Sequence, residues 1–204
     1  MKFYDCEMAP SPRRVSLFIA EKGADIETVQ INLRDHEQFS DSFQKINPDC
    51  VVPALELDDG SVITEVVAIC AFIEAKFPEP NLMGASDEER ARVLMWNAKV
   101  EQQGLSAVAD VFRNTMEGFK DRAMTGTDSY AQLPELAERG RKRTQAFYRR
   151  LDGQLANNEF VAGDRYSMAD ITARVTVDFA IRAKMPVPDD AQHVQRWHGA
   201  VTAR

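Results

Sequence analysis

Hydrophobic positions in the first 77 residues switch between the period of a strand and that of a helix. FYDC at residues 3–6 and the alternating ETVQINL at residues 27–33 predict two strands. Between them, apolar positions 15 and 17–19 predict a helix over residues 12–22, which Gly23 ends. Residues 36–45 predict a short, irregular helix that Asn47-Pro48 ends.

Residues 51–70, VVPALELDDGSVITEVVAIC, predict a strand, a tight turn, a second strand and a helix over about residues 65–77. Asp59-Gly60 between apolar runs is a hairpin signal. Pro53 donates no backbone hydrogen bond, so we expect it at a strand start or on an exposed edge. The resulting order, β-α-β-α-β-β-α, is the thioredoxin-like arrangement.

Residues 78–86, PEPNLMGAS, predict a linker, and the pattern beyond it is helical. Ser86 and Glu89 form a capping box for a long helix that we expect to reach about residue 119, with a bend near Gly104.

Three further helices are predicted. One spans residues 132–156, a second follows Ser167, which Asp170 complements in a capping arrangement, and the last includes Trp197. The fold class is therefore α/β plus all-α, with a domain at 1–77, a linker at 78–86 and an all-helical domain at 87–204.

Composition excludes several classes of protein. The chain has 204 residues, of which 44% are hydrophobic and 28% are charged, as in a soluble globular protein. A net charge of -7 argues against nucleic acid as a partner. No apolar run is long enough to span a membrane, and no signal peptide is visible. Three cysteines and three histidines have no metal-ligand spacing, which favours a cytoplasmic protein without a metal.

The hairpin and the helix after it suggest a peptide ligand. An unpaired strand edge accepts an extended peptide, and a helix that starts near Thr64 attracts an anion. Glu65 at the same helix terminus could hold a cation. An extended peptide with a free amine and a carboxylate suits this combination, and glutathione has that form.

Three segments carry a resemblance. Val52-Pro53 precedes the strand-turn-strand unit, and Glu65 opens the following helix; this stretch resembles the glutathione-binding half of the cytosolic glutathione transferase family. Residues 1–23 resemble the family's first strand and helix, and residues 160–173 resemble its capping segment. The resemblance implies a thioredoxin-like domain followed by a helical one, glutathione as co-substrate, and a homodimer.

The resemblance also implies roles for individual residues. A cis Val52-Pro53 bond would turn the backbone of Val52 toward the ligand's cysteinyl amide. Glu65 would contact the ligand, and Val66, which stands where the family usually has serine, would offer its N–H to a carboxylate. His36 lies where relatives place polar groups near the glycine carboxylate of glutathione, although a solvated loop histidine is the alternative.

Ser11 is the candidate that activates the glutathione thiol. It has a hydroxyl at a predicted helix start, with Arg13 and Arg14 next to it. The alternative is an ordinary N-cap. Many relatives place the activating group two residues earlier, where this chain has Ala9.

The cysteines have their own alternatives. Cys6 could be a redox nucleophile or a small packing residue. Cys50 could form a mixed disulfide with glutathione, and Cys70 falls on the apolar face of its helix.

Gly104, Val108, Phe112 and Met116 recur every four residues. This face could line a pocket for an apolar electrophile, with Val108, Phe112 and Met116 as its residues, or it could be helix core. The run from Arg139 to Arg143 is expected to be a solvated helix face.

Three functions remain open. The first is a glutathione transferase that ionises the thiol for attack on a small apolar electrophile. The second is a glutathione-dependent thiol-disulfide reductase or peroxidase. The third is a binding protein without turnover, which Ala9 and Val66 favour. In each case the sequence predicts a cytoplasmic protein that binds neither nucleic acid nor membrane.

Overall fold

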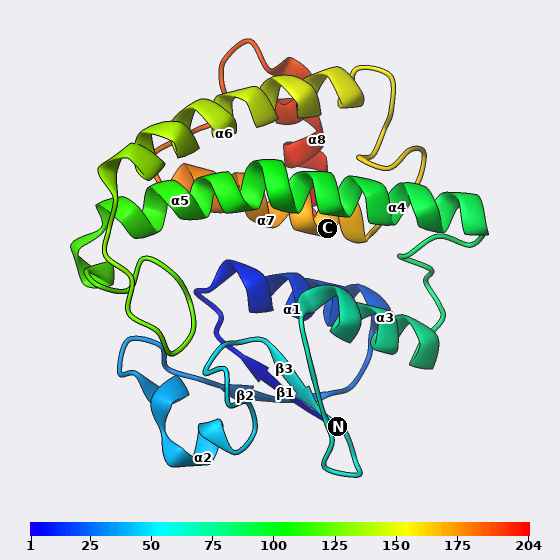
Figure 1. The fold of residues 1–204 in the computed structure, drawn as a ribbon. Coiled ribbons are helices and arrows are strands. Elements are labelled where there is room, and N and C mark those ends of the chain that lie inside the picture. Colours follow the sequence, from blue (N-terminus) through cyan, green and yellow to red (C-terminus); the bar gives the residue numbers. More distant parts are fainter. The chain divides into compact units, whose positions relative to one another are not determined.

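The computed structural model describes residues 1–204, which fall into two compact units. The N-terminal unit comprises Met1–Asn81 together with Thr125–Asp128. The helical unit comprises Leu82–Met124 and Ser129–Arg204. Figure 1 shows the sheet in the first unit and only helices and loops in the second, so the predicted class of fold is confirmed.

The N-terminal unit contains a four-stranded mixed sheet in the order β2-β1-β3-β4. Strand β1 is parallel to β2 and antiparallel to β3, which pairs with β4 in the predicted hairpin. The elements in chain order are β1 (Lys2–Asp5), α1 (Pro10–Lys22), β2 (Glu27–Gln30), η1 (Glu37–Phe39), α2 (Asp41–Gln44), β3 (Ala54–Glu56), β4 (Val62–Thr64) and α3 (Val66–Lys76).

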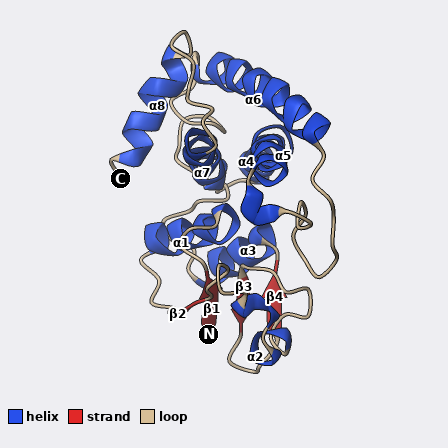
Figure 2. Ribbon diagram, turned by 90° about the vertical axis from the view of Figure 1, so that its left-hand side faces the viewer, coloured by secondary structure: helices blue, strands red, loops and turns tan.

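Helices cover both faces of this sheet. In Figure 2, α1 and α3 lie together on one face and the short α2 lies on the other. On the α2 face, Tyr4, Ile31, Phe43 and Ala54 form a buried apolar cluster. The hydroxyl of Tyr4 donates to Glu56 at 2.7 Å. Burial and this carboxylate raise the pKa of Tyr4 to about 12, so the phenol stays protonated at neutral pH and keeps its hydrogen bond to Glu56.

Pro53 lies at the start of a strand, which is one of the two positions expected for it, and the alternative of an exposed edge is wrong. Pro53 leads into β3, which is an inner strand between β1 and β4, and β4 is the edge. Pro53 is tolerated because it precedes the first ladder residue, Ala54, where no backbone N–H is needed for pairing.

The end of the N-terminal unit is held by a buried lysine. Nζ of Lys22 lies 2.5 Å from a carboxylate oxygen of Glu74 in α3, and it donates to the carbonyl oxygen of Pro80 at 2.6 Å. The side chain of Lys22 has no exposed surface. The first residues of the predicted linker are therefore fixed to α1 and α3, rather than free.

The helical unit contains five α-helices and two short irregular turns. They are α4 (Asp87–Val100), the π-helical turn η2 (Glu101–Leu105), α5 (Ser106–Thr115), η3 (Glu117–Phe119), α6 (Pro134–Leu155), α7 (Met168–Arg182) and α8 (Gln192–Thr202). The π-helical turn η2 contains Gly104, near which a bend was expected, and Ser86 caps α4 as predicted. None of the helices combines the length and the apolar character that crossing a membrane would require.

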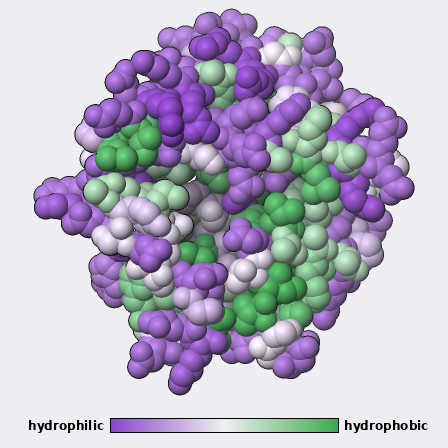
Figure 3. Space-filling view, in the orientation of Figure 1, coloured by the Kyte–Doolittle hydropathy of each residue, from purple (hydrophilic) through white to green (hydrophobic).

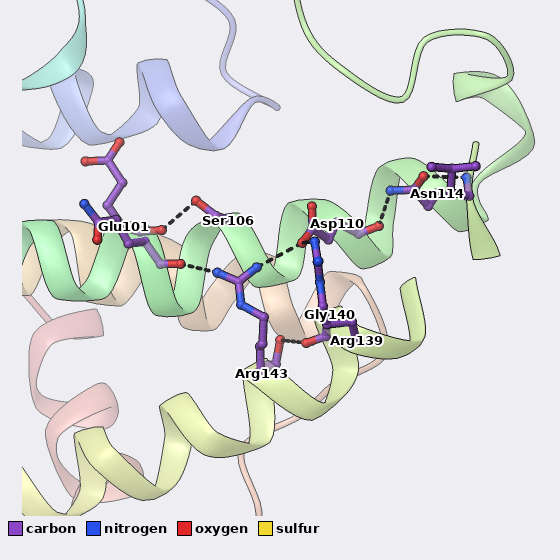
Figure 4. A network of polar contacts seen from close by, with 10 residues as sticks. Glu101, Ser106, Asp110, Asn114, Arg139, Gly140 and Arg143 are labelled. Carbon is purple, nitrogen blue, oxygen red and sulfur yellow. Dashed lines mark hydrogen bonds and ion pairs between the residues drawn. The ribbon is translucent and has the colours of Figure 1, made fainter. Parts of the chain in front are cut away.

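Close packing of α5 on α6 depends on a glycine. A β-carbon on Gly140 would lie 2.7 Å from the carbonyl oxygen of Ala107 and 2.9 Å from a methyl group of Val111. Nearby, Arg143 donates to Asp110 at 3.0 Å and to the carbonyl oxygen of Gln102 (Figure 4). Arg139, Arg141 and Lys142 are exposed, as expected of a solvated face. The expectation was wrong for Gly140 and Arg143, which join α6 to α5 and η2.

Gly140→Ala is expected to lower the free energy of unfolding by about 1–3 kcal/mol. Forced contacts in a packed interface cost that much, and they outweigh the gain of about 1 kcal/mol that alanine brings to a helix. Gly153→Ala on the same helix is the control, because nothing lies within 4 Å of its added carbon. Urea unfolding of both variants tests the packing, and equal stabilisation by both would contradict it.

A buried carboxylate organises the start of α7. Asp170 accepts from the backbone N–H and hydroxyl of Ser167, each at 3.0 Å, which completes the predicted capping box. Its other oxygen accepts from the backbone N–H of Val161 at 2.8 Å and from Nε1 of Trp197 at 2.9 Å. Four donors therefore converge on one side chain with no exposed surface.

Candidate glutathione site

Strand register gathers the candidate residues at one end of the sheet in the N-terminal unit. Ala54 pairs with Tyr4 on one side and with Thr64 on the other. The neighbours of these residues, Pro53 and Glu65, therefore come to the end of the sheet where β1 stops at Asp5. The chain then passes from β1 through residues 6–9 to the start of α1. The end of β1, the entry to β3 and the start of α3 thus meet at this end of the sheet.

The Val52-Pro53 bond is cis, as predicted. Val52 lies outside the strand ladder, and its backbone makes none of the hydrogen bonds of the loops. The side chain of Asn47 donates to the carbonyl oxygen of Val51 at 2.8 Å and fixes the segment just before it. The N–H and C=O of Val52 are therefore available to pair with an extended peptide.

Glu65 lies at the N-cap of α3 with φ 67 and ψ 127. This left-handed φ is uncommon for a residue with a side chain, and such residues concentrate at binding sites. The carboxylate of Glu65 makes no capping bond and is exposed. Val66 is the first helical residue, so its N–H is free of the helix ladder, while its side chain is 4% exposed and packs inward.

The start of α1 differs from the expected N-cap. Helix α1 begins at Pro10, so Ala9 is the N-cap and Ser11 is the second helical residue. The alternative that Ser11 is the N-cap was therefore wrong. Because Pro10 and Pro12 lack a backbone N–H, Ser11 has the only N–H in the first three helical positions. Ser11 was not identified from the sequence as the only backbone donor in this turn, although the alternation Pro10-Ser11-Pro12 indicates it.

The hydroxyl of Ser11 is next to a buried charge. Arg14, which is 3% exposed, directs Nη2 toward Oγ of Ser11 at 3.4 Å. With this oxygen as acceptor, the hydroxyl proton can point elsewhere, toward an anion at the helix start. Ser11 therefore combines an N–H and an O–H with a nearby guanidinium and the helix N-terminus.

The three cysteines are in different environments. Cys6 follows β1 and is partly exposed, close to the start of α1. Cys50 is buried, and its thiol donates to the carbonyl oxygen of Pro48 at 3.6 Å. Cys70 is buried in α3, where burial raises the pKa of its thiol, in agreement with the core position predicted for it. No group of three or more His, Cys, Asp or Glu side chains is arranged to hold a metal ion.

The remaining predicted residues do not form one face. His36 is exposed in the loop after β2, with its ring stacked on Phe39. In the helical unit, Val108 is fully buried, and Phe112 packs on Phe119 and Phe179. The expectation that Met116 continues this helix face was wrong, because α5 ends at Thr115 and Met116 is extended and 48% exposed.

Comparison with known proteins agrees with this geometry. Residues 9–76 match the glutathione S-transferase N-terminal domain, and residues 97–204 match the glutathione S-transferase C-terminal domain. The chain is 32% identical over 209 residues to glutathione S-transferase 2 of Saccharomyces cerevisiae, covering 100% of this chain and 86% of that protein. It is 30% identical over 179 residues to maleylacetoacetate isomerase of Rattus norvegicus, covering 84% and 74%.

A crystal structure of a glutathione S-transferase domain-containing protein from Marinobacter aquaeolei VT8 matches with a TM-score of 0.92 at 37% identity, covering 100% of this chain and 98% of that one. The chain belongs to the glutathione S-transferase family.

Proposed function

We propose that this enzyme binds glutathione at the end of the sheet and ionises its thiol for attack on a small apolar electrophile. The observation that carries the proposal is the convergence of three features in one unit: the unpaired backbone of Val52, the carboxylate of Glu65 and the first turn of α1. The backbone of Val52 can pair with an extended peptide, Glu65 can attract its free amine, and the first turn of α1 can stabilise its thiolate.

Each group has a role that follows from its chemistry. The backbone of Val52 pairs with the cysteinyl amide, and Glu65 attracts the free amine. The N–H of Val66 binds a carboxylate at the positive end of α3, and His36 is assigned to the glycine carboxylate on the family resemblance alone. Since Val66 lacks the hydroxyl that the family usually has here, glutathione affinity is expected to be weak. One charge-assisted hydrogen bond contributes about 1.5–3 kcal/mol.

Ser11 stabilises the thiolate. Its hydroxyl and N–H are donors that require no movement when charge develops on sulfur. A free thiol has a pKa near 8.5, so lowering it by about two pH units makes glutathione mostly ionised at pH 7. The helical unit supplies the apolar surface for the electrophile. The proposal includes a homodimer and a cytoplasmic location, which the family resemblance and the cysteine usage support.

Calorimetric titration with glutathione tests the binding half of this proposal. Glu65→Gln is expected to weaken binding by about ten- to a hundredfold, because a charge-assisted contact to the amine becomes a neutral one. Glu27→Gln is the matched control, since Glu27 is an exposed carboxylate at the opposite end of the same sheet. Equal affinities of Glu65→Gln and wild type would reject the assignment of Glu65.

A paired assay distinguishes the proposed activity from its alternatives. Glutathione conjugation with an apolar electrophile is compared with glutathione-dependent reduction of a disulfide. Conjugation that exceeds reduction supports the transferase. Reduction that depends on Cys6 supports the thiol-disulfide alternative, and glutathione binding without either activity supports a binding protein.

A further inference from the structure

A buried carboxylate lies at the end of β1, where the sheet meets the candidate glutathione site. Asp5 is the last residue of β1 and is 5% exposed, although acidic side chains are almost never buried unless they are paired. Its Oδ2 accepts a hydrogen bond from Nε2 of Gln30 at 2.8 Å, and its Oδ1 has no hydrogen-bond partner within the chain. A buried oxygen without a partner costs free energy, so stability alone does not explain a carboxylate at this position.

Gln30 joins this carboxylate to the chain that follows β1. Asp5 and Gln30 are register partners in the parallel pair of β1 and β2, and the N–H of Ile31 donates to the carbonyl oxygen of Asp5 at 2.7 Å. The side-chain amide of Gln30 is used at both ends. Its Nε2 donates to Asp5, and its Oε1 accepts from the backbone N–H of Glu7 at 3.1 Å. One side chain of β2 therefore connects the end of β1 with the second residue after it.

The segment held by Gln30 is a tight turn. The N–H of Ala9 donates to the carbonyl oxygen of Cys6 at 2.8 Å, which closes a turn over residues 6–9. In Figure 1 the chain passes through this turn from β1 to the start of α1. Glu7 and Met8 are exposed, and Figure 3 shows from the same side that hydrophilic side chains cover more of this face than hydrophobic ones do. Hydrogen bonds, rather than burial, therefore hold the turn.

The turn determines where α1 begins. The carbonyl oxygen of Ala9, the last residue of the turn, accepts from the N–H of Arg13 at 3.3 Å in the first turn of α1. Pro10 restricts the backbone between the turn and Ser11, because its ring fixes φ. A displacement of Glu7 or Ala9 is therefore passed on to Ser11, whose N–H and hydroxyl are the proposed donors to the thiolate.

We propose that Asp5 and Gln30 are positioning residues for the reaction. Their hydrogen bond holds the turn of residues 6–9, and the turn sets the place of Ser11 relative to the glutathione thiol. The inference rests on the proposed function. Donors stabilise a developing charge best when they are fixed before the charge forms, and a displacement of about 1 Å can cost up to about a hundredfold in rate. Both side chains act through the turn and not by contact with the thiol.

Gln30→Ala removes both contacts of this side chain. The pKa of the glutathione thiol bound to the variant, measured by ultraviolet absorbance, is expected to rise by about one pH unit toward that of the free thiol, and kcat/KM for conjugation to fall about tenfold. The dissociation constant of glutathione should stay within about threefold of wild type, because the backbone of Val52 and the carboxylate of Glu65 are unchanged. A purely structural role would lower stability without moving the thiol pKa of the folded enzyme.

Glu27→Ala is the matched control. Lys2 and Glu27 are also register partners in β1 and β2, and Nζ of Lys2 lies 3.9 Å from Oε1 of Glu27 at the opposite end of the same two strands. This variant should keep the thiol pKa and the kcat/KM of wild type. Equal effects of Glu27→Ala and Gln30→Ala would mean that both act through general stability, and the inference would be wrong.

Exchange of the two functional groups tests the hydrogen bond itself. Gln30→Glu places two carboxylates opposite each other and removes the donor to Asp5, while the N–H of Glu7 keeps an acceptor. It should therefore impair the enzyme about as much as Gln30→Ala. The double variant Asp5→Asn/Gln30→Glu restores a donor and an acceptor in exchanged positions, and its kcat/KM should recover to within about threefold of wild type.

Asp5→Asn alone separates position from charge. Asparagine keeps an oxygen that can accept from Gln30 but carries no charge, so the thiol pKa should remain that of wild type. A shift as large as that of Gln30→Ala would mean that the charge of Asp5 acts on the thiol directly, which would contradict a positioning role.

The outcomes separate this inference from the proposed function. A thiol pKa that is lowered in wild type, returns toward the free value in Ser11→Ala and stays lowered in Gln30→Ala overturns the inference alone. A thiol that titrates like free glutathione in wild type overturns both. If Gln30→Ala is too unstable to purify, the exchanged double variant decides: recovery relative to Gln30→Glu supports the inference, and impairment that persists overturns it.

Discussion

Asp170→Ala is expected to lower the free energy of unfolding by about 3–5 kcal/mol, a large part of the stability of an ordinary domain. The substitution removes the acceptor of four hydrogen bonds from residues in three segments, the loop at Val161, Ser167 at the start of α7, and Trp197 of α8. Each buried donor left without a partner costs about 1–3 kcal/mol. Relief of the buried charge offsets part of this sum.

Urea unfolding followed by circular dichroism measures the effect. Asp152→Ala is the control, because Asp152 also accepts from two N–H groups at a helix start, those of His193 and Val194, but is only half-buried. Its loss should cost about 1 kcal/mol, as for an ordinary cap. Equal effects of the two substitutions would show that the buried network adds nothing to simple capping.

The difference in stability between wild type and Asp170→Ala is expected to depend on pH. Burial raises the pKa of Asp170 to about 6, although its four hydrogen bonds act in the opposite direction. The folded state therefore binds more protons than the unfolded state between about pH 4 and 6, and the contribution of this carboxyl to stability falls by about 3 kcal/mol as pH rises through that range. The difference between wild type and Asp170→Ala should be larger at pH 4 than at pH 7. A smaller difference at pH 4 would mean that the hydrogen bonds dominate.

Ser11→Ala is expected to reduce kcat/KM for glutathione conjugation by about a hundredfold or more. Loss of one donor to a developing anion costs about 2.7–4 kcal/mol. Because Ser11 is the second residue of α1 and not its N-cap, the substitution removes no cap, and its cost in stability is that of the long contact from the buried Arg14, about 1 kcal/mol. The backbone N–H of Ser11 remains, so some activation of the thiol should persist.

Cys6→Ala is the matched comparison. Cys6 is partly exposed and precedes the same helix start, but it lies outside the first turn of α1. Conjugation should continue at a rate close to that of wild type when turnover is expressed per folded molecule. If Cys6→Ala abolishes activity while Ser11→Ala leaves it intact, the chemistry belongs to Cys6 and the redox alternative replaces the transferase.

Much of the fold could be predicted because local signals agreed with long-range packing. The hairpin at Asp59-Gly60, the cap at Ser86 and the capping box at Asp170 each combine a turn or cap residue with a clear apolar period. The start of α3 was predicted to within one residue, since Glu65 and the apolar run after it mark the same boundary.

The errors arose where position depends on contacts that the sequence does not display. Pro53 suggested an edge strand, but β1 and β4 enclose β3, and a proline just before the ladder is compatible with an inner strand. The apolar period through Met116 suggested a longer helix, but Gln132 and Asn114 fix a turn there instead. Residues 139–143 are rich in basic residues, which suggests a solvated face. The close approach of α5 shows that Gly140 and Arg143 belong to the interface between α5 and α6.

Titration of the glutathione thiol bound to the wild-type enzyme, followed by the ultraviolet absorbance of the thiolate, tests the central claim most directly. The account predicts a pKa about two pH units below the value near 8.5 of a free thiol, and a return toward that value in Ser11→Ala. A bound thiol that titrates near 8.5 in the wild-type enzyme would contradict the account, because the start of α1 would then not stabilise a thiolate.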